Sequence, residues 1–404
     1  MKKFLYAATI VSTALIASCC GSKDAGNGSE LTLSGINPAD YDTTICVGYD
    51  FESSKFVPIA EDAKPVKLYT LKNKNGMEVC ITNFGGRVVS IMVPDKEGKM
   101  VDVCCGFDKV ENYFPWNYET DFGCSVGRYA NRIDGGTFTL PEGGDPIVLD
   151  KNNNGHASLH GGFTGWQYVV YDVEEATEQS LILSHVSPDG DNKFPAEVKV
   201  TVKFELTDDN ALAINFDGVA DAPTVLNMTN HTYFNLAGHE TGSICDQKIR
   251  IEADVITPVD DGLIPLGTYM PVAGTPLDMD GTHTIGEGLG RIDDCPQMQP
   301  AGGYDHNFVL RKGEAVGLVA TACDEKSGRK MLVISDQPAV QLYTACTTDL
   351  KGGKGGVHYG KFSGFCLETQ HCPDDPNHPQ FPGTTVLRPG EKYDTTTIYA
   401  FRTF

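Results

Sequence analysis

The stretch VKVTVKFELTDDNALAINFDGVA, residues 198 to 220, decides the fold class. In its first half, apolar residues alternate with polar ones, which is the period-two pattern of a strand with one buried face. These apolar residues are Val198, Val200, Val202, Phe204 and Leu206. The polar segment TDDN separates this run from a second one, ALAINFDGVA. The two runs predict an antiparallel β-hairpin whose outer face is solvated.

Similar short runs recur along the chain, and clusters of Gly, Pro, Asp and Asn separate them. They are MEVCITNF, RVVSIMV, YVVYDV, SLILSHV, QKIRIEA, KMLVISD and TTIYAFR, and only DKVENYF hints at a short helix. With 44 glycines and 22 prolines between strands, the pattern predicts an all-β protein, a large antiparallel β-sandwich. We find no internal repeat and no interdomain linker after residue 65, so residues 65–404 are expected to form one domain.

The N-terminus has the layout of a signal peptide, predicted at residues 1–18. Lys2 and Lys3 precede the apolar stretch FLYAATIVSTALIAS, which is too short for a stable transmembrane helix. The residues IASC, ending at Cys19, resemble a bacterial lipobox. This resemblance implies lipidation of Cys19 and a protein anchored to a bacterial membrane outside the cytoplasm; an ordinary secretory peptide is the alternative. Residues 19–64 are expected to hold a Gly/Ser-rich tether and an irregular segment without clear periodicity.

Charge and cysteine usage exclude several classes of function. A formal net charge of −22 argues against a nucleic-acid partner and disfavours a strongly anionic substrate such as a sugar phosphate. The thirteen cysteines are irregularly spaced and form no CxxC pair, so we expect most of them to be small buried hydrophobes. The segment HCPDDPNH fits no standard zinc pattern and is broken by prolines, so no metal is expected.

One carboxylate lies where an apolar side chain is expected. In GFCLETQHCPDDPNHPQFP, residues 364 to 382, Glu368 directly follows the apolar run FCL. Burying an unpaired carboxylate costs several kcal/mol, so such a residue is usually turned to solvent or held for a function. Four other stretches concentrate polar residues of catalytic type: GRYANRI (127–133), SLHGG (158–162), NMTNHTYFNLAG (227–238) and GGYDHNFVL (302–310). In a β-sandwich such groups can converge on one face of a sheet.

Each residue in these stretches also has a structural interpretation. Alternation would place His231 and Tyr233 on one face of a strand, yet a lone histidine is more often structural than catalytic. His160 lies in a turn whose glycines allow a ligand to approach the backbone closely. Aspartate often initiates turns, so Asp305 is open to that structural interpretation. Arg128 is equally open to interpretation as a surface cation. From these residues alone, both interpretations stay open.

Taken together and in order, several sequence blocks resemble the aldose 1-epimerase family, the galactose mutarotases. The blocks are GRYANRI, LHGG, TNHTYFNLAG, TPVDDGLIPLG, GYDHNFVL, PAVQLYT, FCLETQHCPDDPNHPQFP and LRPGEKY. The resemblance runs from about residue 66 to the C-terminus. It implies a single-domain antiparallel β-sandwich, the galactose mutarotase-like supersandwich. It also implies interconversion of the α and β anomers of free aldoses, such as galactose or glucose, without a cofactor.

By this resemblance, Glu368 is the catalytic base and His231 the catalytic acid. The residues that the resemblance and its blocks suggest for sugar binding are Arg128, Asn131, His160, Asp305, Gln341 and Tyr233. Two alternatives stay open: a noncatalytic sugar-binding β-sandwich protein and a hexose-6-phosphate 1-epimerase, which the low Lys and Arg content disfavours. The expected partner is a monosaccharide, with membrane contact only through the lipid anchor, and a monomer is the default.

Overall fold

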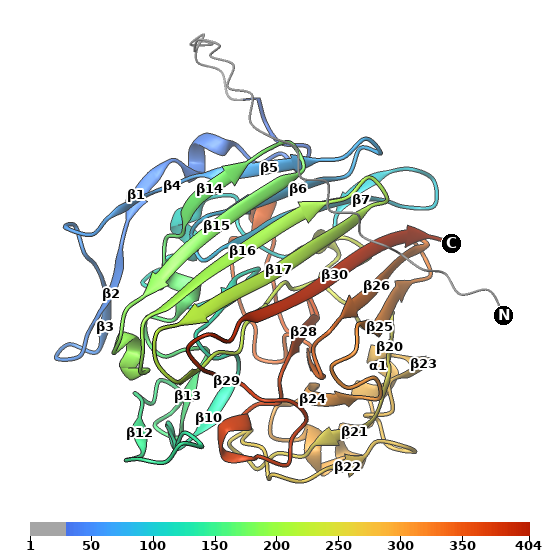
Figure 1. Ribbon diagram of the computed structural model, residues 1–404. Coiled ribbons are helices and arrows are strands. Elements are labelled where there is room, and N and C mark those ends of the chain that lie inside the picture. Colours follow the sequence, from blue (N-terminus) through green and yellow to red (C-terminus); the bar gives the residue numbers. More distant parts are fainter. Residues whose placement is uncertain (1–29) are drawn as a thin grey trace.

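The computed structural model describes residues 30–404, so the predicted signal peptide and Cys19 lie outside the described residues. The described chain is built almost entirely of antiparallel strands arranged in large sheets (Figure 1). This confirms the predicted all-β class and the antiparallel sandwich. Within residues 30–404, no helix is long and apolar enough to cross a membrane.

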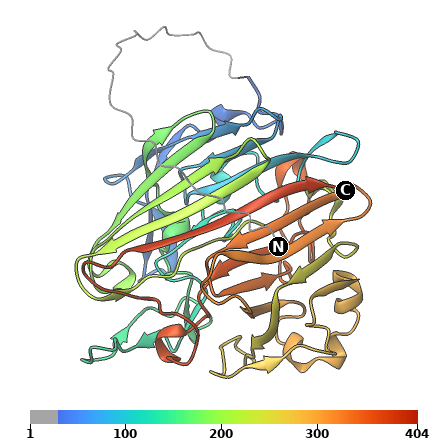
Figure 2. The ribbon, with the colours of Figure 1, turned by 45° about the vertical axis from the view of Figure 1, so that its right-hand side comes forward.

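The largest sheet has nine strands, in the order β14-β15-β16-β17-β30-β26-β25-β20-β23. Figure 2 shows it as one continuous twisted layer. Its strands, in that order, are Asp172–Ala176, Ser180–Ser187, Val198–Leu206, Ala211–Ala220, Tyr393–Thr403, Arg329–Ser335, Gly317–Asp324, Lys248–Ile251 and Asp280–Thr284. The predicted hairpin is β16 paired with β17, from Val198 opposite Ala220 to Leu206 opposite Leu212. All five alternating apolar residues of β16 are buried, as the sequence pattern predicts.

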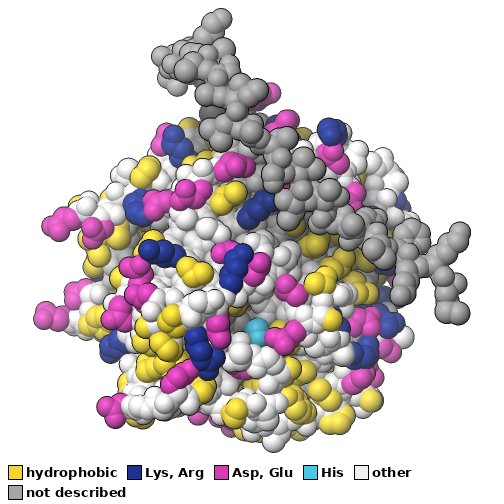
Figure 3. Space-filling model, in the orientation of Figure 1, with side chains coloured by type: hydrophobic (Ala, Val, Ile, Leu, Met, Phe, Trp, Pro, Cys, Tyr) yellow, Lys and Arg dark blue, Asp and Glu magenta, His cyan; other side chains and the backbone are white. Residues whose placement is uncertain are grey.

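The outer face of the nine-stranded sheet is solvated. Figure 3 shows Lys and Arg side chains interspersed with Asp and Glu over this face. One example is the exposed pair of Lys203 and Glu205 on β16. The opposite face of the same strands carries the apolar residues. This inner face therefore packs on the core.

Two smaller sheets pack against the inner face of the nine-stranded sheet. The five-stranded sheet has the order β22-β21-β24-β27-β28 and the four-stranded sheet the order β5-β6-β7-β8. Val202 of β16, Ile91 of β7 and Leu342 of β27 belong to one buried cluster, so all three sheets share one core. In the orders just given, the strands are Met270–Pro271, Ala253–Thr257, Asp305–Leu310, Ala339–Tyr343 and Cys366–Gln370, then Leu68–Lys72, Glu78–Thr82, Arg87–Pro94 and Met100–Asp102.

Short two-stranded ribbons and single helical turns complete the described chain. The ribbons are β1 (Thr43–Ile45) with β4 (Lys64–Val66), β2 (Val47–Asp50) with β3 (Lys55–Pro58), β9 (Ser125–Val126) with β19 (Thr229–Asn230), β10 (Arg132–Asp134) with β13 (Ala157–Leu159), β11 (Thr137–Phe138) with β12 (Ile147–Val148), and β18 (Thr224–Val225) with β29 (Val386–Leu387). The α-helix α1 (Ile285–Leu289) starts with a capping box between Thr284 and Glu287. The 3₁₀ helices are η1 (Pro38–Tyr41), η2 (Val110–Tyr113), η3 (Trp166–Tyr168), η4 (Asp191–Lys193), η5 (His239–Thr241), η6 (Ile292–Asp294), η7 (Pro296–Met298), η8 (Lys354–Gly356) and η9 (Asp375–Asn377). The helical hint in DKVENYF corresponds to η2.

The segment before residue 65 is more ordered than the sequence predicts. Its described part forms η1 and the strands β1 to β4, and it buries Ile36, Tyr41 and Ile45 in a second apolar cluster. The Tyr41 hydroxyl donates to the Phe107 carbonyl at 2.7 Å, which ties the segment to the body of the protein. Strands of three or four residues are too short to display a clear alternation, which is why the sequence shows no periodicity here.

The cysteines follow the prediction. Among the eleven cysteines of residues 30–404, the structure has no disulfide, and eight of the eleven are buried. Burial raises the pKa of the Cys104 thiol to about 12 and that of Cys80 to about 11. These side chains are therefore neutral and pack as small apolar groups.

Candidate active site

The five-stranded sheet places three of the predicted site residues on one face. Gln341 on β27 pairs with Glu368 on β28, and Asp305 lies two residues before Asn307, the partner of Gln341 on β24. The opposite face of the same strands enters the main core through Phe308, Val340, Leu342 and Leu367. Alternation therefore explains the apolar run before Glu368: Leu367 faces the core while Glu368 faces the other side of the sheet.

That other side borders a cavity of about 850 Å³. The cavity brings together six of the eight predicted catalytic and sugar-binding residues: Glu368, His231, His160, Asp305, Asn131 and Tyr233. Gln341, a seventh predicted residue, contacts the site through Asp305, because its side-chain amide donates to Asp305 Oδ1 at 2.6 Å. The five stretches of catalytic-type residues, scattered along the sequence, therefore converge.

His231 lies directly after β19 and is held by its own backbone. Its N–H donates to the Cys124 carbonyl at 2.8 Å, and its carbonyl accepts from the Gly123 N–H at 2.9 Å. The Tyr233 ring stacks on the imidazole with 5.0 Å between ring centroids and 21° between planes. His231 Nε2 lies 3.5 Å from Glu368 Oε1. A potential proton donor and a potential proton acceptor thus face one another in a buried position.

Burial moves the pKa values of this pair in opposite directions. Loss of hydration raises the pKa of Glu368 well above its usual range, and the nearby Asp305 and Asp121 add to the rise. Loss of hydration lowers the pKa of His231. Among the described residues, neither Glu368 Oε2 nor His231 Nδ1 has a hydrogen-bond partner. Buried polar atoms without partners are costly, so a ligand that hydrogen-bonds to them gains affinity here.

His160 is fixed as a neutral hydrogen-bond donor. Its Nδ1 accepts the backbone N–H of Asn131 at 3.2 Å, and burial lowers its pKa to about 4. The neutral ring therefore carries its proton on Nε2. The glycine after it is required by the fold itself. Gly161 has φ +84°, and a Cβ there would lie 2.2 Å from the Gly127 carbonyl oxygen.

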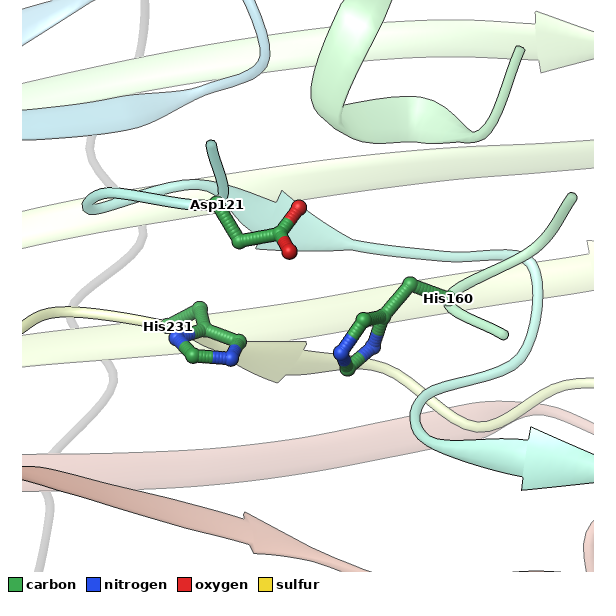
Figure 4. Close-up of side chains that lie close together, drawn as sticks. All are labelled: Asp121, His160 and His231. Atoms are coloured by element: carbon green, nitrogen blue, oxygen red, sulfur yellow. The ribbon is translucent and has the colours of Figure 1, made fainter. Parts of the chain in front are cut away.

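The structure adds Asp121, which the sequence analysis missed. Asp121 lies in the loop before β9, and its carboxylate points toward His160 and His231 (Figure 4). The nearest nitrogen and oxygen atoms of these three side chains all lie within 4.8 Å of one another. The one available signal was its position in TDFGCSV, the stretch that leads into GRYANRI.

The structure corrects the assignment of Arg128. Its guanidinium donates to the backbone carbonyls of Pro195 at 2.7 Å and Ala196 at 3.0 Å, and it does not line the cavity within the described chain. Arg132, four residues later in the same block, lines the cavity, with a guanidinium nitrogen 4.0 Å from Asp305 Oδ2. Arg128 is therefore structural, and Arg132 is the arginine of this block that faces the cavity.

Two groups of side chains have donor atoms close enough to hold a metal ion. One is Asp121, His160 and His231, and the other is His231, Cys366 and Glu368. In the second group, burial raises the pKa of the Cys366 thiol well above its usual range, which disfavours the thiolate that a metal prefers. Both groups contain His231, so a metal there would occupy the proposed acid.

Comparisons with known proteins identify the family of this chain. The family model described as aldose 1-epimerase matches residues 67–400. Galactose mutarotase from Bos taurus is 40% identical over 327 residues, which cover 80% of this chain and 91% of the bovine protein. Aldose 1-epimerase from Escherichia coli K12 is 33% identical over 345 residues, or 85% of this chain and 97% of that protein.

Solved structures of aldose epimerases have a similar fold. An aldose epimerase homologue from C. elegans superposes with a TM-score of 0.76 at 28% identity, covering 84% of this chain and 99% of that chain. Galactose 1-epimerase from Lactobacillus acidophilus gives a TM-score of 0.73 at 27% identity, covering 85% and 96%. With a family model matching most of its length and relatives this similar, the chain belongs to the aldose 1-epimerase family.

Proposed function

We propose that this protein interconverts the α and β anomers of free aldoses, with Glu368 as the base and His231 as the acid. The observation that carries the proposal is the 3.5 Å separation of His231 Nε2 and Glu368 Oε1 on one wall of the cavity. The two oxygens of a sugar hemiacetal, O1 and the ring oxygen, are bonded to the same carbon. An acid and a base this close can therefore each reach one of them.

Ring opening needs both groups at once. Glu368 takes the proton of the O1 hydroxyl while His231 gives a proton to the ring oxygen, and the C1–O5 bond breaks to leave an open-chain aldehyde. Rotation about C1–C2 followed by the reverse proton transfers closes the ring with the other anomeric configuration. Positioned acid and base groups contribute on the order of 10²- to 10⁴-fold each.

The remaining polar side chains orient the sugar. His160 Nε2–H donates, while Asp305 accepts and is itself held by Gln341. Arg132 and Asn131 also line the cavity. Charge-assisted hydrogen bonds from these groups to sugar hydroxyls fix which oxygen faces Glu368.

The charges of the cavity argue against the phosphate alternative. Five carboxylate side chains line it: Glu119, Asp121, Asp305, Asp349 and Glu368. Within the described chain, Arg132 is the one Lys or Arg side chain that lines it. A sugar phosphate would meet net repulsion here, so a neutral aldose suits the site better than a hexose 6-phosphate. A purely binding role leaves unexplained why a base and an acid face one another.

Polarimetry tests the proposed activity. Freshly dissolved α-D-galactose and α-D-glucose change rotation slowly as they approach anomeric equilibrium in buffer. With the protein present, we expect a faster approach to the same final rotation, at a rate proportional to protein concentration. An unchanged rate for every aldose, pentoses included, would contradict the proposal.

We also propose that residues 1–18 are a signal peptide, that Cys19 carries a lipid, and that a monomeric catalytic domain begins near residue 65. Support for the anchor comes from the IASC sequence and from the apolar stretch before it. Expressed in a bacterium, the full chain is expected to partition into the detergent phase of Triton X-114, and the Cys19→Ala variant into the aqueous phase. Equal partitioning would contradict the anchor, and sedimentation velocity would check the monomer.

A further inference from the structure

Asp121 places a carboxylate beside the proposed acid without a Lys or Arg partner. Its side chain points toward His160 and His231 (Figure 4), and the nearest nitrogen and oxygen atoms of the three lie within 4.8 Å of one another. Among residues 30–404, no Lys or Arg side chain forms an ion pair with Asp121, and its side-chain hydrogen-bond partner is the Cys124 thiol, at 4.0 Å. Because His160 is neutral and His231 gives up its proton during ring opening, Asp121 can bind a cation that arrives with the substrate.

The charge of the whole cavity favours a cation as well. Arg132 is the one Lys or Arg side chain of the described chain that lines it, against five carboxylates, and it lies 4.0 Å from Asp305 Oδ2. Glu119, two residues before Asp121, also lines the cavity and forms no ion pair with a Lys or Arg side chain of the described residues. A cavity lined by an excess of one charge concentrates ligands of the opposite charge.

The cavity also offers buried polar atoms to a ligand, so it is more than an acidic surface. Glu368 is 1% exposed and lines the cavity, and its Oε2 has no hydrogen-bond partner among the described residues. Burial, Asp305 and Asp121 all raise the pKa of Glu368. A substrate cation nearby would favour the ionised form of this carboxylate, which is the form that a base requires.

We propose that the cavity favours protonated amino sugars, so that 2-amino-2-deoxyaldoses such as D-galactosamine are substrates for anomer interconversion. This inference rests on the proposed function. With O1 at Glu368 and the ring oxygen at His231, the substituent on C2 is one carbon away from the reacting centre. An ammonium on C2 donates to Asp121, where a neutral sugar presents a hydroxyl. The reaction is unchanged, because the nitrogen takes no part in the proton transfers at O1 and the ring oxygen.

Polarimetry with two sugars that differ only at C2 tests this substrate class. α-D-Galactose carries a hydroxyl there, and α-D-galactosamine hydrochloride carries an amine whose pKa is similar to that of a chain-terminal amino group, about 7.7–8.0. At about pH 6.5 this amine is therefore charged. After subtraction of the spontaneous rates, we expect kcat/KM for galactosamine to be about 3- to 10-fold higher than for galactose, the size of a partly screened ion pair. The gain should lie mainly in KM, since the attraction acts before and during the reaction alike.

The ratio of kcat/KM for galactosamine to that for galactose isolates the contribution of Asp121. Asp121→Asn removes the charge and should bring this ratio to within about twofold of one. A change in the pKa values of the free protein, or in the folded fraction, affects both sugars alike and cancels in the ratio. The matched control Asp246→Asn removes the same charge from a side chain that is 72% exposed, pairs with Lys326 and lies outside the cavity lining. It should keep the wild-type ratio.

Salt provides a test that needs no variant. Raising the ionic strength from about 0.01 M to about 1 M shortens the Debye length from about 30 Å to about 3 Å, so the wild-type ratio should fall toward one. A ratio that stays constant with salt would contradict an ionic contact.

The outcomes separate the substrate class from the activity. If galactose is accelerated but galactosamine is not favoured over it, or if Asp121→Asn keeps the wild-type ratio, the inference is overturned and the proposed function stands. A ratio that falls in Asp121→Asn and with salt, but not in Asp246→Asn, supports the inference. If neither sugar is accelerated, the proposed function fails and the inference with it.

Discussion

His231 Nε2 lies 3.5 Å from Glu368 Oε1, although the two residues belong to different elements of the fold. Glu368 is on β28 of the five-stranded sheet, and His231 follows the short ribbon of β9 and β19. The packing of these two elements therefore positions the proposed acid against the proposed base. Both side chains are at most 5% exposed, so the dielectric around them is low and their proton transfers are insulated from bulk water.

Replacing the acid should leave a folded, nearly inactive protein. His231→Asn keeps a polar side chain at the position, but that side chain cannot protonate the ring oxygen. We expect kcat to fall about 10²- to 10⁴-fold while the melting temperature changes little. Polarimetry and thermal unfolding check both parts. If His231→Asn keeps full activity while His160→Asn loses it, the acid is His160.

The rate of mutarotation should depend on pH through the protonation states of Glu368 and His231. Activity needs a deprotonated Glu368 and a protonated His231. It therefore falls at low pH, where both groups are protonated, and at high pH, where both are deprotonated. The profile is bell-shaped, and its two limbs are set by the raised pKa of Glu368 and the lowered pKa of His231.

Burial sets the main shifts, and the charge of Asp121 raises the pKa of both groups because it favours their protonated forms. The Asp121→Asn variant should therefore move both limbs of the pH–rate profile to lower pH. Asp349→Asn, which removes another carboxylate from the cavity lining, should move neither. Limbs that stay fixed, or move to higher pH, in Asp121→Asn would contradict this electrostatic account.

The two arginines of GRYANRI should separate stability from activity. Arg128→Met removes the buried guanidinium that donates to the carbonyls of Pro195 and Ala196, and we expect a loss of about 2–5 kcal/mol in the free energy of unfolding. Arg132→Met removes a cation from the cavity, and we expect kcat/KM to fall about 10- to 100-fold with a smaller loss of stability. Urea unfolding and polarimetry measure the pair. The reverse pattern would restore Arg128 as the sugar-binding arginine.

A buried ion pair next to the second apolar cluster should be important for stability. Lys354 Nζ donates to Asp102 Oδ2 at 2.5 Å and to the Val89 carbonyl at 2.7 Å. Lys354→Met leaves the Asp102 carboxylate buried without its cation, so we expect a loss of about 3–5 kcal/mol by urea unfolding. Lys203→Met, which breaks the exposed pair with Glu205, should cost less than about 1 kcal/mol. Similar losses in the two variants would contradict this ranking.

The sequence was sufficient to predict strands where a periodic pattern was present, and to predict site residues where a block of motifs was present. Alternation predicted the β16–β17 hairpin because a solvated sheet face forces polar residues at every second position. The blocks around Glu368, His231, His160 and Asp305 predicted a site that the structure does assemble. The same alternation explains why Glu368 can follow Leu367 and yet face away from the core.

The remaining features depend on tertiary packing. Arg128 lies between β9 and β10, and Arg132 is the first residue of β10. These strands have only two and three residues, so no alternation shows which arginine faces the cavity. Asp121 lies in a loop, and only the packing of that loop against His160 and His231 places it in the site. The β2–β3 hairpin is too short to be recognised in the sequence, yet Tyr49 and Phe56 line a cavity of about 590 Å³ that shares His160 and Asp121 with the proposed active site.

The most direct test of the central claim compares the wild type with Glu368→Gln, a substitution that keeps the shape of the side chain and removes its basicity. Polarimetry of fresh α-D-galactose gives the rate, and calorimetric titration with the same sugar gives the affinity. We predict that the wild type accelerates mutarotation and that Glu368→Gln binds galactose with an affinity within about tenfold of the wild type but loses at least about 10²-fold in rate. A Glu368→Gln variant with near-normal turnover would contradict the assignment of the base.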